Sequence, residues 1–121
     1  MGSFSIRNKT RVTLRDLLFK KIKERVLGKP YELSLAVVSL SESRRLTKIT
    51  KHADHASNVL SFPLSKKSGE IVLCPKARGE YTLEYLFIHG ALHLKGLKHN
   101  ARMDAAEERL LKHFRLQKRN K

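Results

Sequence analysis

The chain has 121 residues, 40% of them apolar, with 26 Lys and Arg against 11 Asp and Glu, a formal net charge of +15. This length suits one domain with one core, and the composition excludes both a disordered chain and a membrane protein, because no apolar run approaches the roughly 20 residues that span a bilayer. The charge favours a polyanionic partner, and we expect nucleic acid rather than a membrane surface. A basic protein without such a partner is the alternative.

The cysteine content and the N-terminus bear on the compartment. Cys74 is the only cysteine, so no internal disulfide can form. The opening residues, MGSFSIRNKT, lack the apolar stretch of a secretory signal. We therefore expect a reducing compartment, the cytoplasm.

The first half of the chain predicts two strands and two helices. Residues 4–7 alternate apolar and polar, which indicates a short strand. Thr13 is suited to cap a helix over residues 14–27, which Gly28 would end. Residues 31–40 read as a strand, and Ser41 is expected to open a second helix that runs through residue 51. The apolar face of the first helix comprises Leu14, Leu17, Leu18, Ile22 and Val26.

The second half predicts a hairpin and two more helices. After a polar loop at 52–58, short apolar runs at 59–63 and 70–74 flank a segment of hairpin composition. Helices are expected over 81–96 and 102–114, followed by a basic tail. We therefore predict a single α+β domain over residues 1–121, with one small mixed β-sheet packed against helices. The 81–96 helix is apolar nearly all round, so it should be central and buried.

The stretch HGALHLKGLKH carries the chemistry. His89 and His93 are four residues apart, which places both imidazoles on one face of the predicted helix. Gly96 releases the chain, so His99 can fold back as a third ligand of one ion, for which we expect zinc. Three protein ligands leave a tetrahedral ion one open position, where water has its pKa lowered toward about 7. The alternative is that these are hydrogen-bonded histidines of the core.

The remaining histidines do not suggest a second site. His52 and His55 form a pair in a polar loop with no evident further ligand, and we expect them to face solvent or RNA. His113 is read as an ordinary residue near a helix C-terminus. Gly90 stands where zinc proteases of the H-E-x-x-H type place their general base, which disfavours peptide hydrolysis.

The histidine stretch resembles the H-G-x-L-H-L-x-G-x-D-H signature of the YbeY endoribonuclease family, the bacterial rRNA maturation factors. Upstream, SNVLSFP is similar to the family's T-D-V-L-S-F-P and GEIVLC to its G-D-I-V-I-C. Downstream, MDAAEERLL is similar to the family's final helix. The resemblance covers most of the chain and is strongest between Leu46 and Leu111.

The resemblance implies a function and a set of roles. His89, His93 and His99 would bind one zinc ion per chain, and the substrate would be RNA, in rRNA maturation and ribosome biogenesis, with the small ribosomal subunit as a further partner. Lys51 stands where the family has an arginine that contacts phosphate, and it would offset charge developing on the phosphorane. Ser57 and Asn58 would position water or substrate.

Three departures from the family pattern keep two hypotheses open. Lys98 replaces the acid before the third histidine, Asn58 replaces the acid before V-L-S-F-P, and Thr50 and Lys51 replace a Tyr-Arg pair. The intact histidines favour a metal-dependent endoribonuclease that acts on single strands. The missing acids favour a non-catalytic, basic RNA-binding assembly factor that retains the metal site. A hydrolase of some small substrate would leave the charge unexplained.

Overall fold

The sheet is the framework of the molecule. A computed structural model describes residues 2–120 and contains one four-stranded sheet, in the order β1-β2-β4-β3. The strands β1, β2 and β4 run parallel to one another, and β3 pairs antiparallel to β4 across a tight turn. The strand bounds are Phe4–Asn8 for β1, Glu32–Val37 for β2, Val59–Ser65 for β3 and Ser68–Leu73 for β4. The predicted α+β class with one mixed sheet is confirmed.

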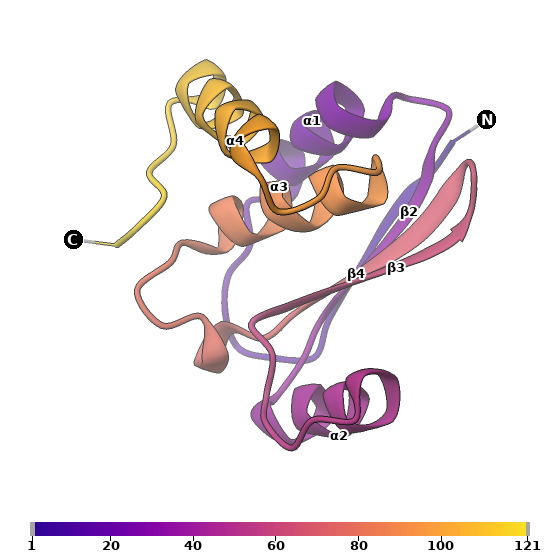
Figure 1. The fold of residues 1–121 in the computed structure, drawn as a ribbon, viewed down its shortest axis with the longest axis vertical. Helices are drawn as coiled ribbons and strands as arrows, with labels where there is room; N and C mark the ends of the chain where they lie inside the picture. The colour runs from indigo at the N-terminus through magenta and orange to yellow at the C-terminus, as the bar shows by residue number, and fades with distance from the viewer. Residues whose placement is uncertain (1, 121) are drawn as a thin grey trace.

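Helices cover both faces of the sheet unequally (Figure 1). The helices α1 (Asp16–Leu27), α3 (Leu83–Leu94) and α4 (Ala101–Phe114) lie on one face, and α2 (Leu40–Lys51) lies alone on the other. A single 3-10 turn, η1 (Pro75–Ala77), follows β4. None of the helices within residues 2–120 has the length and apolar character needed to cross a bilayer.

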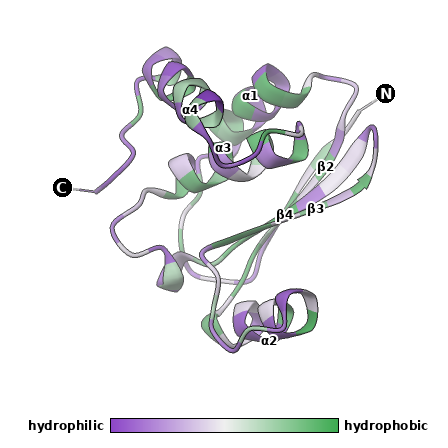
Figure 2. Ribbon diagram, viewed as in Figure 1, coloured by the Kyte–Doolittle hydropathy of each residue, from purple (hydrophilic) through white to green (hydrophobic). Residues whose placement is uncertain are grey.

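The helix α3 lies at the centre of the main core. It is buried between the sheet and the helices α1 and α4, and apolar residues run along most of its length (Figure 2). Phe87 on α3 stacks on Phe19 of α1 with the ring centroids 4.8 Å apart. A second, smaller core lies beneath α2. The prediction of a central, buried helix at this position is therefore confirmed, and the helix that carries two of the candidate ligands is rigidly held.

All four predicted helix starts are shifted by one or two residues, and α3 spans Leu83–Leu94 instead of the predicted 81–96. The helix α1 begins at Asp16 rather than after Thr13, and its N-cap residue is Arg15, which makes no capping hydrogen bond through its side chain. The helix α2 is capped by Ser39, whose hydroxyl accepts the Glu42 amide at 3.3 Å, and not by Ser41. The preceding strand consequently ends at residue 37 instead of 40.

The basic segment after α4 is fixed in place. The Thr82 hydroxyl donates to the Gln117 carbonyl at 2.7 Å, and the Thr82 amide donates to the Lys118 carbonyl at 3.0 Å. Arg119 forms an ion pair with Glu80 at 2.8 Å. This part of the chain therefore supports the loop that leads into α3.

Candidate metal centre

The cap of α3 sets the position of the first two histidines. The Thr82 hydroxyl accepts the Tyr85 amide at 3.1 Å and starts the helix, and His89 and His93 follow one turn apart on its half-exposed side. Because the opposite side of α3 is buried against the sheet and α1, rotation of the helix about its axis is blocked. The two imidazoles therefore have a fixed direction.

Gly90 allows α3 to approach the sheet closely. A Cβ at this position would lie 3.0 Å from the Ser61 hydroxyl and 3.1 Å from a Val59 methyl group. The Ser61 hydroxyl also donates to the Gly90 carbonyl at 2.9 Å. Gly90 thus allows α3 to pack closely against β3. It also leaves this position without the general base that zinc proteases of the H-E-x-x-H type have there.

A short loop between α3 and α4, held by hydrogen bonds at both ends, places His99 beside the other two histidines. Gly96, with φ of 106°, leaves the helix in a conformation that glycine adopts readily. The Leu97 amide then donates to the Leu92 carbonyl at 3.1 Å. At the other end, the Asn100 side chain caps α4 by accepting the Arg102 and Met103 amides. His99 lies between these two anchors, so it reaches the cluster without a long flexible segment.

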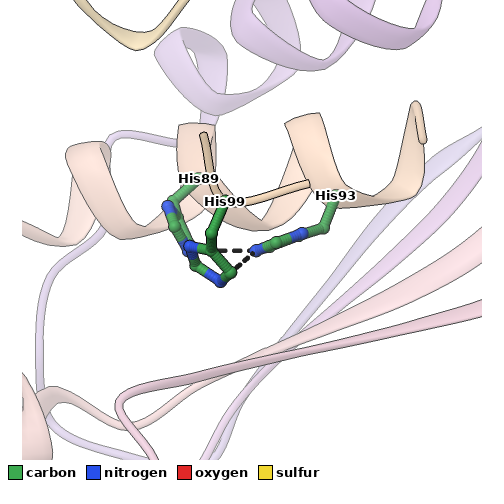
Figure 3. Close-up of side chains that lie close together, drawn as sticks. All are labelled: His89, His93 and His99. Atoms are coloured by element: carbon green, nitrogen blue, oxygen red, sulfur yellow. Dashed lines mark hydrogen bonds between the residues drawn. The ribbon is translucent and has the colours of Figure 1, made fainter. Parts of the chain in front are cut away.

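The three imidazoles converge through their Nε2 atoms (Figure 3). The Nε2 atom of His93 lies 3.1 Å from that of His89 and 3.0 Å from that of His99. One ligand atom from each of the three residues lies within 4.8 Å of the others. The structure therefore brings together all three residues that the sequence singles out as metal ligands.

The outer nitrogens of two ligands have fixed partners. His89 Nδ1 lies 2.5 Å from a Glu107 carboxylate oxygen, and His93 Nδ1 lies 3.1 Å from the Leu97 carbonyl oxygen. Both partners are acceptors, so in the neutral imidazoles both Nδ1 atoms carry the proton. The two Nε2 atoms, 3.1 Å apart, then face each other with lone pairs, and a cation between them would satisfy both.

The geometry and electrostatics suit a metal ion in that place. Four-coordinate zinc, at about 2.0–2.1 Å from each nitrogen, separates neighbouring nitrogens by about 3.3 Å, which is close to the spacing in this cluster. Burial, reinforced by the neighbouring His89 and His99, lowers the pKa of His93 from its usual value. The neutral imidazole, which is the form that binds metals, is therefore favoured over the imidazolium.

Glu107 contacts the histidine cluster, and the sequence reasoning missed it. It lies on α4, is only 4% exposed, and its second oxygen accepts the Tyr85 hydroxyl at 3.1 Å. Burial and the adjacent Glu107 carboxylate raise the pKa of Tyr85, so that its hydroxyl remains a donor. A carboxylate that holds the outer nitrogen of a ligating histidine orients the ring and raises its basicity. A signal existed, because Met103, Glu107 and Leu111 share one buried face.

The other predicted site residues lie apart from the cluster. Lys51 is the exposed last residue of α2, on the opposite face of the sheet from α3 (Figure 1). The Ser57 hydroxyl bonds to the Thr47 hydroxyl at 2.7 Å, and Asn58 is half-buried immediately before β3. Lys98, next to His99, is exposed. Within residues 2–120, no hydrogen bond or ion pair joins these side chains to the three histidines.

The remaining histidines are solvent-facing, as expected. His52 ends α2 in a left-handed conformation, and His55 lies in the loop that follows. Both are exposed, as is His113 near the end of α4. They supply no ligand to the cluster at α3.

The fold and the cluster together define a small α+β domain whose buried helix presents three converging histidines supported by a carboxylate. The family model described as Endoribonuclease YbeY matches residues 3–117. The chain therefore belongs to the endoribonuclease YbeY family. Three converging histidines in a member of this family identify the cluster as the candidate functional site.

Individual relatives agree with this assignment. The Endoribonuclease YbeY of Rubrobacter xylanophilus is 40% identical over 80 residues, which cover 63% of this chain and 58% of that protein. The Sulfurimonas denitrificans protein of the same name is 31% identical over 126 residues, which cover 90% of this chain and 89% of the relative. The chain thus spans less than two thirds of the first relative but most of the second.

A solved structure supports the fold. The solution structure of a Thermotoga maritima protein aligns with a TM-score of 0.64 and covers 93% of this chain and 89% of its own. The two sequences are 21% identical, so this likeness concerns the fold alone.

Proposed function

We propose that this protein is a metal-dependent endoribonuclease, with one zinc ion held by His89, His93 and His99. The observation that carries the proposal is the convergence of three Nε2 atoms, with the outer nitrogens of His89 and His93 already committed to other partners. Family membership supplies the reaction class, and the net charge of +15 suits an RNA substrate.

The protein's own residues would prepare the site for this chemistry. Glu107 holds His89 in one orientation and supplies negative charge behind it, while the Leu97 carbonyl orients His93 in the same way. Zinc, when bound there, supplies Lewis acidity toward a phosphoryl oxygen. Because His99 is exposed while His89 and His93 are half-buried, the cluster opens to solvent on the His99 side, where a phosphodiester could enter.

Lys51, Ser57 and Asn58 remain proposals as RNA contacts. Lys51 would meet phosphate groups as a point charge, without the bidentate fork of an arginine. Because α2 lies across the sheet from α3, Lys51 would contact a phosphate outside the histidine cluster rather than offset charge on the phosphorane. The Ser57 hydroxyl is engaged with Thr47, so Asn58 is the better candidate of the two for a polar contact with the substrate.

Action on rRNA precursors, in ribosome biogenesis and near the small subunit, is the corresponding biological proposal. It rests on the family resemblance. The basic surface gives it physical support, since a domain with this charge is drawn to the densest polyanions available to it.

The test measures metal content and RNA cleavage in the same preparations. The parent should hold about one zinc per chain and cleave an rRNA fragment in a single-turnover reaction that EDTA stops. His93→Ala should lose both properties, because the central nitrogen of the cluster is gone. His113→Ala removes an exposed histidine outside the cluster and serves as the matched control. Equal zinc and equal cleavage in the His93→Ala variant and the parent would overturn the proposal.

The second candidate is an RNA-binding assembly factor that keeps the metal site without cleaving. Two observations favour it: Lys51 lies across the sheet from the histidines, and Lys98 stands where the family resemblance leads us to expect an acid. Zinc binding and RNA binding without metal-dependent cleavage would decide for this candidate.

A further inference from the structure

A cavity lies where the three parallel strands end. It has a volume of about 700 Å³ and is lined by residues that follow β1, β2 and β4, within the ranges 9–12, 38–41 and 75–76. In Figure 1 these segments are the loop into α1, the start of α2 and the turn η1, which meet below the sheet. The volume falls within the range of about 300–1,000 Å³ that is usual for ligand pockets.

The topology explains why a crevice forms there. The chain that leaves β1 goes to α1 on one face of the sheet, and the chain that leaves the adjacent β2 goes to α2 on the opposite face. The two connections diverge and leave a gap at the carboxyl ends of the strands. In open α/β sheets, ligands bind in such gaps.

Three cations line the crevice from different segments. Lys9 and Arg11 follow β1, and Lys76 lies in η1 after β4. All three are exposed, and none of them forms an ion pair within residues 2–120. The nearby carboxylate of Glu42 is bound by the Arg45 guanidinium at 2.8 and 3.0 Å. It also attracts Lys9 at longer range without forming an ion pair with it, so it offsets part of the positive charge of the crevice and leaves the rest.

The walls of the crevice are preorganised. The Asn8 side chain fixes the loop of Lys9 and Arg11 by accepting the Thr10 amide at 2.9 Å and donating to the Val12 carbonyl at 2.7 Å. The start of α2 adds the positive end of a twelve-residue helix. Apolar side chains complete the lining, so that a group with both an anionic and an apolar part fits: Val12, Val38, Leu40 and Pro75.

We propose that this crevice binds a phosphate group of a ribonucleotide in single-stranded RNA, at a site separate from the histidine cluster. The phosphate would lie among Lys9, Arg11 and Lys76, with its sugar or base against the apolar residues. The choice of RNA rests on the proposed function, but the crevice itself depends neither on the metal nor on cleavage. The crevice would hold the RNA at the carboxyl ends of the β-strands, away from the histidine cluster.

The test compares two variants of equal charge. One carries Lys9→Gln, Arg11→Gln and Lys76→Gln. The control carries Lys21→Gln, Lys66→Gln and Lys67→Gln at three positions outside the crevice. Binding of a single-stranded oligoribonucleotide is measured by fluorescence anisotropy in EDTA, so that neither metal nor cleavage contributes. The crevice variant should bind about tenfold more weakly than the control, and its slope of log K against log salt should be shallower by about 0.7 for each phosphate that it no longer binds.

Two further measurements locate the phosphate. Oligonucleotides with and without a 5′ phosphate show whether the crevice binds a terminal phosphate or one within the strand. If it binds the terminal phosphate, the 5′ phosphate should raise the affinity of the parent but not that of the crevice variant. Titration of the ¹⁵N-labelled parent with AMP should shift the amides of residues 9–12 and 39–41, and this needs no variant to fold. Equal affinity of the two triple variants, or no amide shifts at these residues, would overturn the proposal. A protein that binds RNA as predicted but does not cleave it would contradict the proposed function of the histidine site and not the proposal for the crevice.

Discussion

Replacement of Glu107 by glutamine should weaken metal binding while the fold is retained. The glutamine side chain would keep the size of the original and one acceptor, but it removes the negative charge that faces the outer nitrogen of His89. Because Glu107 is only 4% exposed, no water can take over its place readily. The perturbation is therefore confined to the support of one ligand and one tyrosine hydroxyl.

The size of the effect follows from the role of the carboxylate. Loss of a carboxylate behind a metal-bound histidine typically lowers metal affinity by about 10–100-fold, which corresponds to about 1.4–2.7 kcal/mol. The metal-free protein should change little in stability, or gain some, because a buried charge is replaced by a neutral amide. Glu107→Ala, by contrast, leaves the Tyr85 hydroxyl and His89 Nδ1–H without a partner and should cost about 1–3 kcal/mol for each group.

The assay is a zinc titration in competition with a chromophoric chelator, paired with urea denaturation of the metal-free proteins. Glu108→Gln is the matched control, because it removes the same charge from an exposed neighbour on α4. Tyr85→Phe isolates the contribution of the hydroxyl. If Glu107→Gln binds zinc as tightly as Glu108→Gln, the carboxylate does not support the metal ligands and the reasoning fails.

Three further predictions concern the surroundings of the cluster. Gly90→Ala should lower the free energy of unfolding in urea by about 1–2 kcal/mol, because the added methyl group meets the Ser61 hydroxyl at 3.0 Å and overpacking outweighs the gain in helix propensity. Lys98→Asp should raise zinc affinity by less than about tenfold in the same chelator titration, since the exposed ammonium is already screened; addition of Asn58→Asp tests whether cleavage rises as well. Deletion of residues 117–121 should lower the melting temperature in a thermal scan and weaken RNA binding, yet leave zinc content unchanged, because that segment holds Thr82 and not the ligands.

The ligand set could be predicted from the sequence because its geometry is local. His89 and His93 are placed by the helical repeat, and His99 follows after a glycine that ends the helix. All three lie within the short stretch HGALHLKGLKH, so no knowledge of the tertiary fold is needed to bring them together. The same holds for the individual strands, which could be recognised from short apolar runs.

The contact between Glu107 and the ligand His89 could not be predicted in the same way. Glu107 lies 18 residues from His89, and their contact depends on how α4 crosses α3. An acid on the buried face of the last helix is a visible anomaly, but the sequence does not say which group it meets. The crevice at the strand ends is less predictable still, because it depends on β2 lying between β1 and β4, and strand order is a non-local property.

The position of Glu107 changes what the missing acids mean. The family signature places an acid directly before the third histidine, where this chain has Lys98, and that loss by itself suggests a weakened metal site. In the structure, however, negative charge reaches the cluster from α4, and Lys98 is exposed. The ligands therefore retain anionic support without the acid at position 98. The choice between an enzyme and a binding protein then turns less on the metal site than on which cation contacts the scissile phosphate.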